Sequence, residues 1–304
     1  MWNPSKRILV VVLSASFLSC LASCHAQSSN ADETLVRVSA LLARESDADS
    51  LAAAAVLSIT QGSAQALSLI DKAIAAAPTR ADLIWLKIQF CQRTASCDSE
   101  PLEQRLRQMD STNGAGWMNA LARADLAKQQ AEKDAALKAI SRSDHMDIYW
   151  TTLIAHLGRA VAQTKIMSAR ESEVVVIGLL AAQTLPAYAV VSNACKGELL
   201  SVSEVVETCR GIAKSFQRGD TYVTEMIGVV IAKRVWPKNS PEWQAASDAR
   251  ALYEYRSKLF AELEVDDEAH AEKYLALYAL NRREQDVILA TIIAAGKSPF
   301  PPAR

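Results

Sequence analysis

Apolar residues recur every three or four positions along most of the chain, which is the spacing of one face of an α-helix rather than of a β-strand. One such stripe runs through residues 35–42 and a second through residues 67–74, where Pro78 ends the run. The valine-rich segment 174–180 is short enough for a strand, but its polar flanks favour a buried helix. Only 10 glycines and 9 prolines occur in 304 residues, so turns are scarce. The pattern predicts an all-α fold.

The second half of the chain carries signals for the beginnings and ends of helices. Ser201 and Glu204 have the spacing of a capping box, which predicts a helix start at this point. Ser240 followed by Pro241 predicts the N-cap and first residue of a later helix. Gly296 predicts the end of the last helix. We therefore expect helices up to residue 296.

Three tryptophans mark an internal period. Trp85, Trp117 and Trp150 lie 32 and 33 residues apart, and each begins a new apolar helix shortly after the end of an Ala- or Leu-rich one. A period near 33 with the order helix, turn, helix resembles the tetratricopeptide repeat. Ala77 and Pro78 match the small residue and the proline that close one unit of that family.

The resemblance is partial, because residues 110–111 stand where a proline is expected and the Gly and Tyr after the first Trp are missing. It implies antiparallel helix pairs stacked as an α-solenoid of about 11 to 13 helices. We expect degenerate repeats in residues 31–170, a helical region continuing the same array in residues 171–296, and a tail in residues 297–304. A plain helical bundle with coincidental tryptophans is the alternative.

The N-terminal segment has the pattern of a secretion signal. Lys6 and Arg7 precede an apolar stretch that is too short to span a bilayer comfortably. The sequence Leu-Ala-Ser-Cys that follows resembles the lipobox of bacterial lipoproteins, and Cys24 takes the place of the lipidated cysteine. That resemblance implies a signal peptide in residues 1–23, an anchor linker in residues 24–30 and, since no aspartate follows the cysteine, the outer membrane. Secretion without an anchor, by cleavage after residue 26, is the alternative.

The remaining cysteines fit an oxidising compartment. With Cys20 discarded and Cys24 acylated, four of the six cysteines are left: Cys91, Cys97, Cys195 and Cys209. An even number in a secreted protein indicates disulfides, and of the three possible pairings the two local ones are the simplest. Neither spacing is C-x-x-C and no histidine lies near, so a zinc site or a thioredoxin-like role is disfavoured.

Charge and motifs give no sign of catalysis. The net charge of −1 provides no basic surplus for nucleic acid. No nucleophile elbow, P-loop or dinucleotide motif occurs. We interpret His25, His145, His156 and His270 as solvated or core residues, and the acidic residues 262–268 as a helix junction rather than a calcium loop. Arg282 and Arg283 suggest surface ion pairs, with recognition of an acidic partner as the alternative. The sequence predicts no catalytic, cofactor or metal site.

These observations lead to one functional expectation and two alternatives. We expect a non-catalytic protein–protein interaction module, lipid-anchored and facing the periplasm, because stacked helix pairs present a concave face to a protein or peptide partner. The first alternative is an immunity or inhibitor lipoprotein that acts against a cell-wall-degrading toxin. The second is an enzyme acting on envelope polymers, since two carboxylates in a groove leave no motif. Two buried carboxylates converging in a deep cleft would favour that enzyme.

Overall fold

The structure, a computed structural model, describes residues 32–59, 62–94, 97–183, 186–263 and 268–302, and these fold into helices joined by turns. Residues 32–42 are helical. The elements that follow are α2 Ala48–Ser58, α3 Ser63–Ala76, α4 Ala81–Cys91, α5 Glu100–Met109, η1 Gly114–Trp117, α6 Met118–Leu126, α7 Gln130–Ser141, α8 Trp150–Gln163, α9 Ala169–Ala181, α10 Tyr188–Ala194, η2 Gly197–Ser201, α11 Ser203–Gln217, α12 Tyr222–Val235, α13 Pro241–Ala261, α14 Glu268–Leu280 and α15 Glu284–Ala294.

The all-α fold with sequentially packed helices is confirmed. Most consecutive helices pack against each other, among them α2 on α3, α4 on α5, α6 on α7 and α8 on α9. This arrangement is that of an α-solenoid built from helix pairs. There are more helices in the described residues than the predicted 11 to 13, because a short element such as α10, with 7 residues, leaves no clear period in the sequence.

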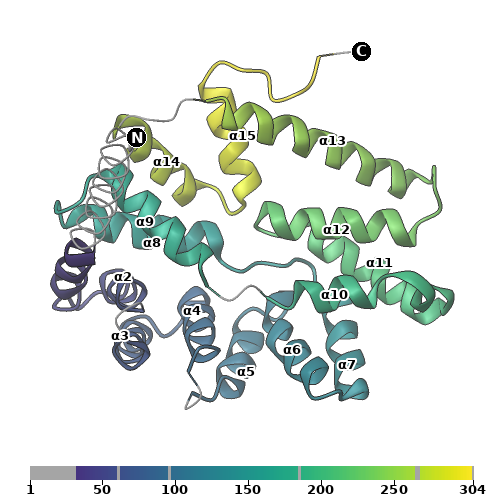
Figure 1. The fold of residues 1–304 in the computed structure, drawn as a ribbon, viewed down its shortest axis with the longest axis horizontal. Coiled ribbons are helices and arrows are strands. Elements are labelled where there is room, and N and C mark those ends of the chain that lie inside the picture. Colours follow the sequence, from purple (N-terminus) through teal and green to yellow (C-terminus); the bar gives the residue numbers. More distant parts are fainter. Residues whose placement is uncertain (1–31, 60–61, 95–96, 184–185, 264–267, 303–304) are drawn as a thin grey trace, which may run out of the picture.

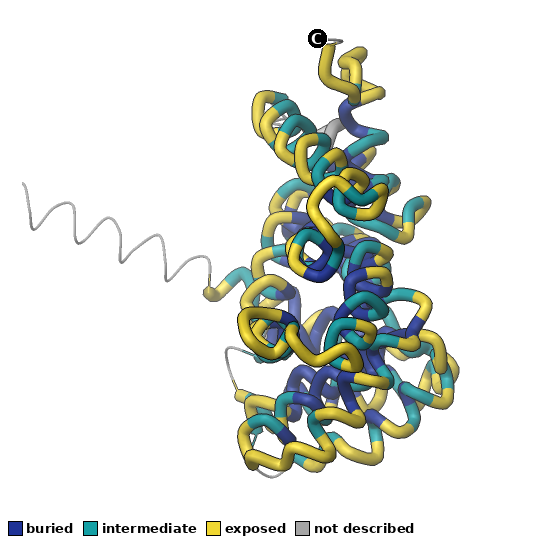
Figure 2. The backbone as a smooth tube through the Cα atoms, turned by 90° about the vertical axis from the view of Figure 1, so that its right-hand side faces the viewer, coloured by how far each residue is buried: buried dark blue, intermediate teal, exposed yellow. Residues whose placement is uncertain are grey.

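Packing in chain order is interrupted after α7. Helix α8 packs against α2 as well as against α9 and α14. Helix α7 packs against α11 instead of α8. Figure 1 shows the result: α2 to α7 form one arc, and α11 to α15 form a second arc on the opposite side, with α8 and α10 between the two arcs. Segments far apart in the sequence therefore face one another across the middle of the molecule. In Figure 2 the buried residues gather on the inner sides of the helices, and the outer sides are exposed.

The three repeat tryptophans are not equivalent. Trp85 is the fifth residue of α4, Trp117 is the last residue of η1, and Trp150 is the first residue of α8. The ring of Trp85 is buried, whereas Trp117 and Trp150 are half-buried against the core. The guanidinium of Arg107 lies 4.4 Å from the centre of the Trp117 ring. The period thus marks the start of successive helix pairs, but only one of the three positions is fully inside.

The capping box predicted at Ser201 and Glu204 is wrong. Helix α11 begins at Ser203, its N-cap Val202 makes no side-chain cap, and the Ser201 hydroxyl donates to Glu198 instead. Because residues 197–201 form a 3₁₀ helix, Ser201 is already inside a helical turn and cannot cap the next one. The predicted helix start at Ser240 is confirmed, since the Ser240 hydroxyl accepts the backbone N–H of Trp243 at 3.2 Å.

Close helix contacts in the second half depend on glycine. A Cβ added at Gly211 of α11 would lie 2.4 Å from the carbonyl oxygen of Ser141 in α7. A Cβ at Gly228 of α12 would lie 2.6 Å from the backbone nitrogen of Gln217 in α11. These two positions let α11 pack tightly against both α7 and α12, which joins the two arcs at one end of the molecule.

Candidate functional site: a central apolar cavity

A cavity of about 240 Å³ lies where the two arcs face one another. Trp85 and Gln89 of α4 line it from one arc, Trp150 of α8 and Gln183 after α9 line it from the middle, and Val223 of α12 lines it from the other. The remaining lining side chains are mostly aliphatic or aromatic: Leu86, Ile148, Leu153, Leu180, Ala181, Pro186 and Tyr188. The cavity is therefore an apolar space assembled from distant parts of the sequence.

Three of the lining side chains hold polar atoms with no hydrogen-bond partner among the described residues. Gln89 is only 3% exposed, and neither its amide nitrogen nor its amide oxygen is bonded. The indole N–H of Trp150 and the amide oxygen of Gln183 are likewise buried and unbonded. Buried polar atoms are almost always paired, so unbonded atoms on three residues that line one cavity are unusual.

The charge of the cavity wall is limited to one carboxyl group. Glu284 lines the cavity, and its Oε2 accepts the backbone N–H of Tyr222 at 2.8 Å. Burial raises the pKa of Glu284, although this hydrogen bond opposes the shift. No lysine, arginine or histidine is among the lining residues of the described chain. The wall therefore suits an uncharged ligand better than an anion.

Asp220 positions two of the lining residues from behind. Its Oδ2 accepts the backbone N–H of Trp150 at 2.8 Å, and its Oδ1 accepts that of Ile148 at 3.0 Å. The carbonyl oxygen of Asp220 accepts the N–H of Glu284 at 2.8 Å. Asp220 is 1% exposed, so this one buried residue fixes the first turn of α8 through its carboxyl group and the first turn of α15 through its backbone carbonyl.

Asp147 lies against Asp220. Its Oδ1 accepts the backbone N–H of Tyr149 at 2.6 Å, and its Oδ2 accepts the Arg282 Nε at 2.8 Å. Burial, followed by the negative charge of Asp147 and a hydrogen bond with it, raises the pKa of Asp220 well above its usual range. Two buried carboxyl groups therefore do converge, but neither is a lining residue of the cavity, and their oxygens bond to backbone and to arginine.

A further polar cluster joins this junction to η1. The amide of Asn113 donates to the carbonyl oxygen of Asp147 at 2.7 Å and accepts the N–H of that residue at 2.9 Å. The Tyr149 hydroxyl donates to Asp110 at 2.8 Å. His145, whose Nε2 lies 3.8 Å from Asp110 Oδ1, lowers the pKa of Asp110, and the hydrogen bonds from Tyr149 and Asn113 help to bring it to about 2, although burial opposes the shift. This cluster holds the loop before α8 in place.

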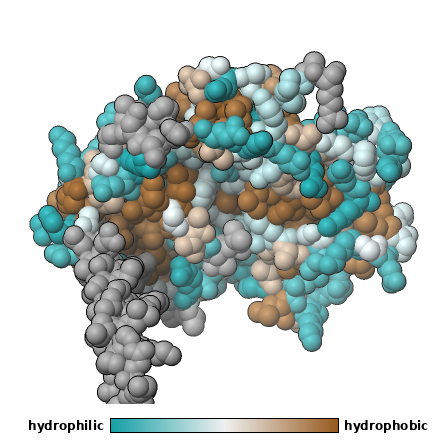
Figure 3. Space-filling model, turned by 45° about the horizontal axis from the view of Figure 1, so that its top comes forward, coloured by the Kyte–Doolittle hydropathy of each residue, from teal (hydrophilic) through white to brown (hydrophobic). Residues whose placement is uncertain are grey.

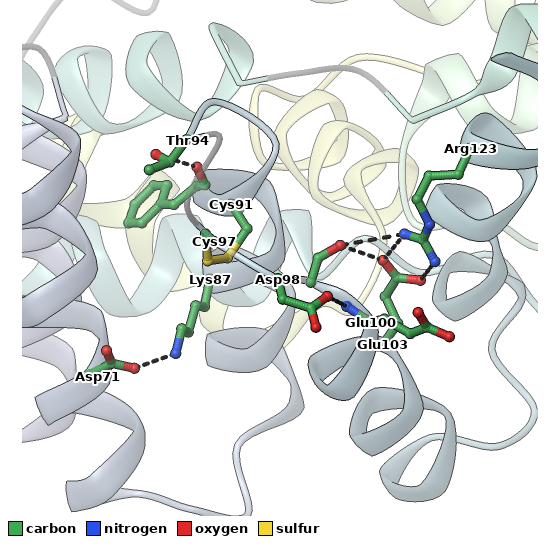
Figure 4. The surroundings of a disulfide bond; sticks show 11 residues. Asp71, Lys87, Cys91, Thr94, Cys97, Asp98, Glu100, Glu103 and Arg123 are labelled. Carbon is green, nitrogen blue, oxygen red and sulfur yellow. Dashed lines mark hydrogen bonds and ion pairs between the residues drawn. A yellow bond between two sulfur atoms is a disulfide. The ribbon is translucent and has the colours of Figure 1, made fainter. Parts of the chain in front are cut away.

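Both predicted disulfides are present. Cys91 bonds to Cys97 with their Cα atoms 5.0 Å apart, and Cys195 bonds to Cys209 at 5.6 Å. Figure 4 shows the first bridge at the end of α4, near the bidentate ion pair of buried Glu103 with Arg123. The bridges fix the end of α4 and the connection from α10 to α11, two elements that support the cavity.

The other residues singled out in the sequence are structural or lie outside the described residues. Cys24 and His25 lie outside them, as do residues 264–267 of the acidic cluster and the side chain of His270. His156 bonds to Asp49 at 2.7 Å, and Arg283 bonds to Glu225 at 3.3 Å and to a backbone carbonyl. Across the described residues, no group of three or more His, Cys, Asp or Glu side chains could hold a metal ion.

No family model, no curated protein and no solved structure matches this chain. In the described part of the chain, none of the helices has both the length and the apolar character that crossing a membrane requires. Trp85 and Trp150 were singled out from the sequence as repeat positions, whereas the other lining residues of the cavity were missed. Gln89 within the apolar run ADLIWLKIQF was a signal, because it places an amide on the buried face of a helix.

Proposed function

We propose that this protein is a non-catalytic binding module that is lipid-anchored through Cys24, faces the periplasm and receives part of a protein or peptide partner in the central cavity. The single observation that carries the proposal is the unbonded amide of Gln89 on the wall of an apolar cavity. An apolar pocket with a few convergent polar groups is the usual form of a binding site. The anchor is supported by the lipobox-like sequence before Cys24.

Binding accounts for the cavity better than catalysis does. A catalytic pair of carboxylates has to face the substrate, and the converging pair Asp147 and Asp220 is occupied by backbone and arginine hydrogen bonds. Among the lining residues that the structure describes, Glu284 is the one with a carboxyl group. This arrangement favours a binding module over an enzyme that acts on envelope polymers, and immunity to a toxin is one form that such binding could take.

Site-specific photo-crosslinking in intact cells tests the proposal. A photoreactive residue at Val223, which is 54% exposed at the cavity, should crosslink a partner, whereas one at Leu126 on α6, 87% exposed and not a lining residue, should not. Ala181→Trp should abolish the Val223 adduct by filling the cavity, and Ala182→Trp, at the next exposed position outside the lining, should leave it intact. Equal adducts from both sites, or an adduct insensitive to Ala181→Trp, would contradict the proposal.

A further inference from the structure

The cavity opens onto a second apolar surface. Val223 lines the cavity and also a shallower groove, which Met226, Ile227 and Val230 of α12 form together with Tyr253 of α13. Positions 223 to 230 span two turns of one helix, about 10 Å at 1.5 Å per residue. Figure 3 shows that such apolar patches lie between hydrophilic side chains on one face of the molecule. The cavity and this groove therefore share the side chain of Val223 as a common wall.

The unbonded atoms on the cavity wall require both donors and acceptors from a ligand. Gln89 offers an N–H donor and a carbonyl acceptor, Trp150 offers a donor, and Gln183 offers an acceptor. A hydrocarbon chain would leave all of them unpaired, whereas a ligand with donors and acceptors would gain hydrogen bonds. A backbone amide carries one donor and one acceptor next to each side chain, which is the complement of the Gln89 amide.

The absence of cationic side chains on the described wall further restricts the chemical class of the ligand. A fatty-acid carboxylate or a phosphorylated headgroup would meet the Glu284 carboxyl group with no lysine or arginine among the lining residues to pair with it. A sugar ring brings several hydroxyl groups that a mostly apolar wall leaves unpaired. An uncharged peptide segment with an apolar side chain meets both conditions.

We infer that the occupant is an extended, uncharged peptide segment of a protein partner. One apolar side chain enters the cavity, its backbone amide pairs with Gln89, and the apolar side chain two residues further on, about 6–7 Å away in an extended chain, lies on α12 between Val223 and Val230. This inference rests on the proposed function, since it names the ligand class of the same cavity. The partner's recognition element is therefore an alternating apolar segment without charges.

Calorimetry with defined probes tests the inference. The probe is the capped tripeptide acetyl-leucyl-alanyl-valinamide, and its matched control is acetyl-lysyl-alanyl-lysinamide. The first should bind the protein at least tenfold more tightly than the second. Gln89→Leu keeps the size of the side chain and removes its amide, so it should weaken the leucyl probe by about tenfold, the effect of one hydrogen bond. Gln183→Leu, at a half-buried position, is the second variant if Gln89→Leu alters the melting temperature.

Lauric acid and N-acetylglucosamine separate the other ligand classes. Lauric acid that binds more tightly than the leucyl probe, and more tightly still to Gln89→Leu, would overturn the inference in favour of an acyl chain. Preferential binding of N-acetylglucosamine would overturn it in favour of a saccharide. If no probe binds while the Val223 adduct still depends on Ala181, the ligand class is wrong and the proposed function stands. If that adduct fails to form, the proposed function fails, whatever the probes do.

Discussion

Replacement of Asp220 gives a sharp test of the junction behind the cavity. The two oxygens of its buried carboxyl group accept the backbone N–H groups of Ile148 and Trp150, at 3.0 and 2.8 Å. Asp220→Ala leaves both donors unpaired, and at about 1–3 kcal/mol for each the free energy of unfolding should fall by about 2–6 kcal/mol. Asp220→Asn keeps one acceptor oxygen, so it should lower the free energy of unfolding by about half as much.

The stability difference between the wild type and Asp220→Asn should also depend on pH. Burial and the neighbouring Asp147 raise the pKa of Asp220 well above 3.8 in the folded protein. As pH rises above about 4, the unfolded chain releases this proton and the folded protein retains it, so the wild type loses up to about 1.4 kcal/mol per pH unit until the pKa of the folded state is reached. Asparagine does not titrate. The stability advantage of the wild type over Asp220→Asn should therefore shrink as pH rises.

Urea unfolding of the three proteins, followed by circular dichroism at about pH 4 and pH 7, measures both effects. Asp220→Ala should unfold at the lowest urea concentration at both pH values, and the gap between wild type and Asp220→Asn should be larger at the lower pH. Equal stabilities of the alanine and asparagine variants would refute the hydrogen-bond reasoning. A gap between wild type and Asp220→Asn that does not change with pH would refute the raised pKa.

Three further predictions concern the bridges, the tryptophans and the anchor. Cys195→Ala together with Cys209→Ala should lower the free energy of unfolding by about 3 kcal/mol, measured by urea unfolding, and an unchanged midpoint would show that the loop needs no bridge. Trp85→Ala, at a buried ring, should lower it by about 3–5 kcal/mol, whereas Trp117→Ala should lower it by about 1 kcal/mol, and equal melting shifts would contradict the difference in burial. Cys24→Ala should release the protein from the membrane fraction or leave it unprocessed, and mature-length protein still in that fraction would exclude lipidation at this cysteine.

Features set by local sequence were predictable. Apolar spacing gave the helices, and the separations within each cysteine pair gave both disulfides, because a short loop brings its own ends together. Ser240 was predictable as an N-cap because the proline after it has no N–H to satisfy. The prediction of an N-cap at Ser201 was wrong, because the 3₁₀ helix around this residue depends on packing rather than on the motif.

The cavity could not be predicted, because it depends on contacts between distant segments. Helix α8 packs on α2, and α11 packs on α7, and no period in the sequence encodes these contacts. Asp147 reads as a turn residue and Asp220 follows a glycine, yet they meet in the buried junction. Gln89 also reads as one polar residue in an apolar helix, and only the fold shows that its amide is left unbonded beside an open space.

The most direct test of the central claim is a side-chain spectrum of protein labelled with ¹⁵N at its six tryptophans. The indole N–H of Trp150, a lining residue, has no hydrogen-bond partner in the described part of the chain. Trp85 lines the same cavity, whereas Trp117 does not. Titration with acetyl-leucyl-alanyl-valinamide should move the Trp150 and Trp85 signals saturably and leave the Trp117 signal in place. Saturable binding that leaves the Trp150 signal unmoved would contradict a binding site in the central cavity.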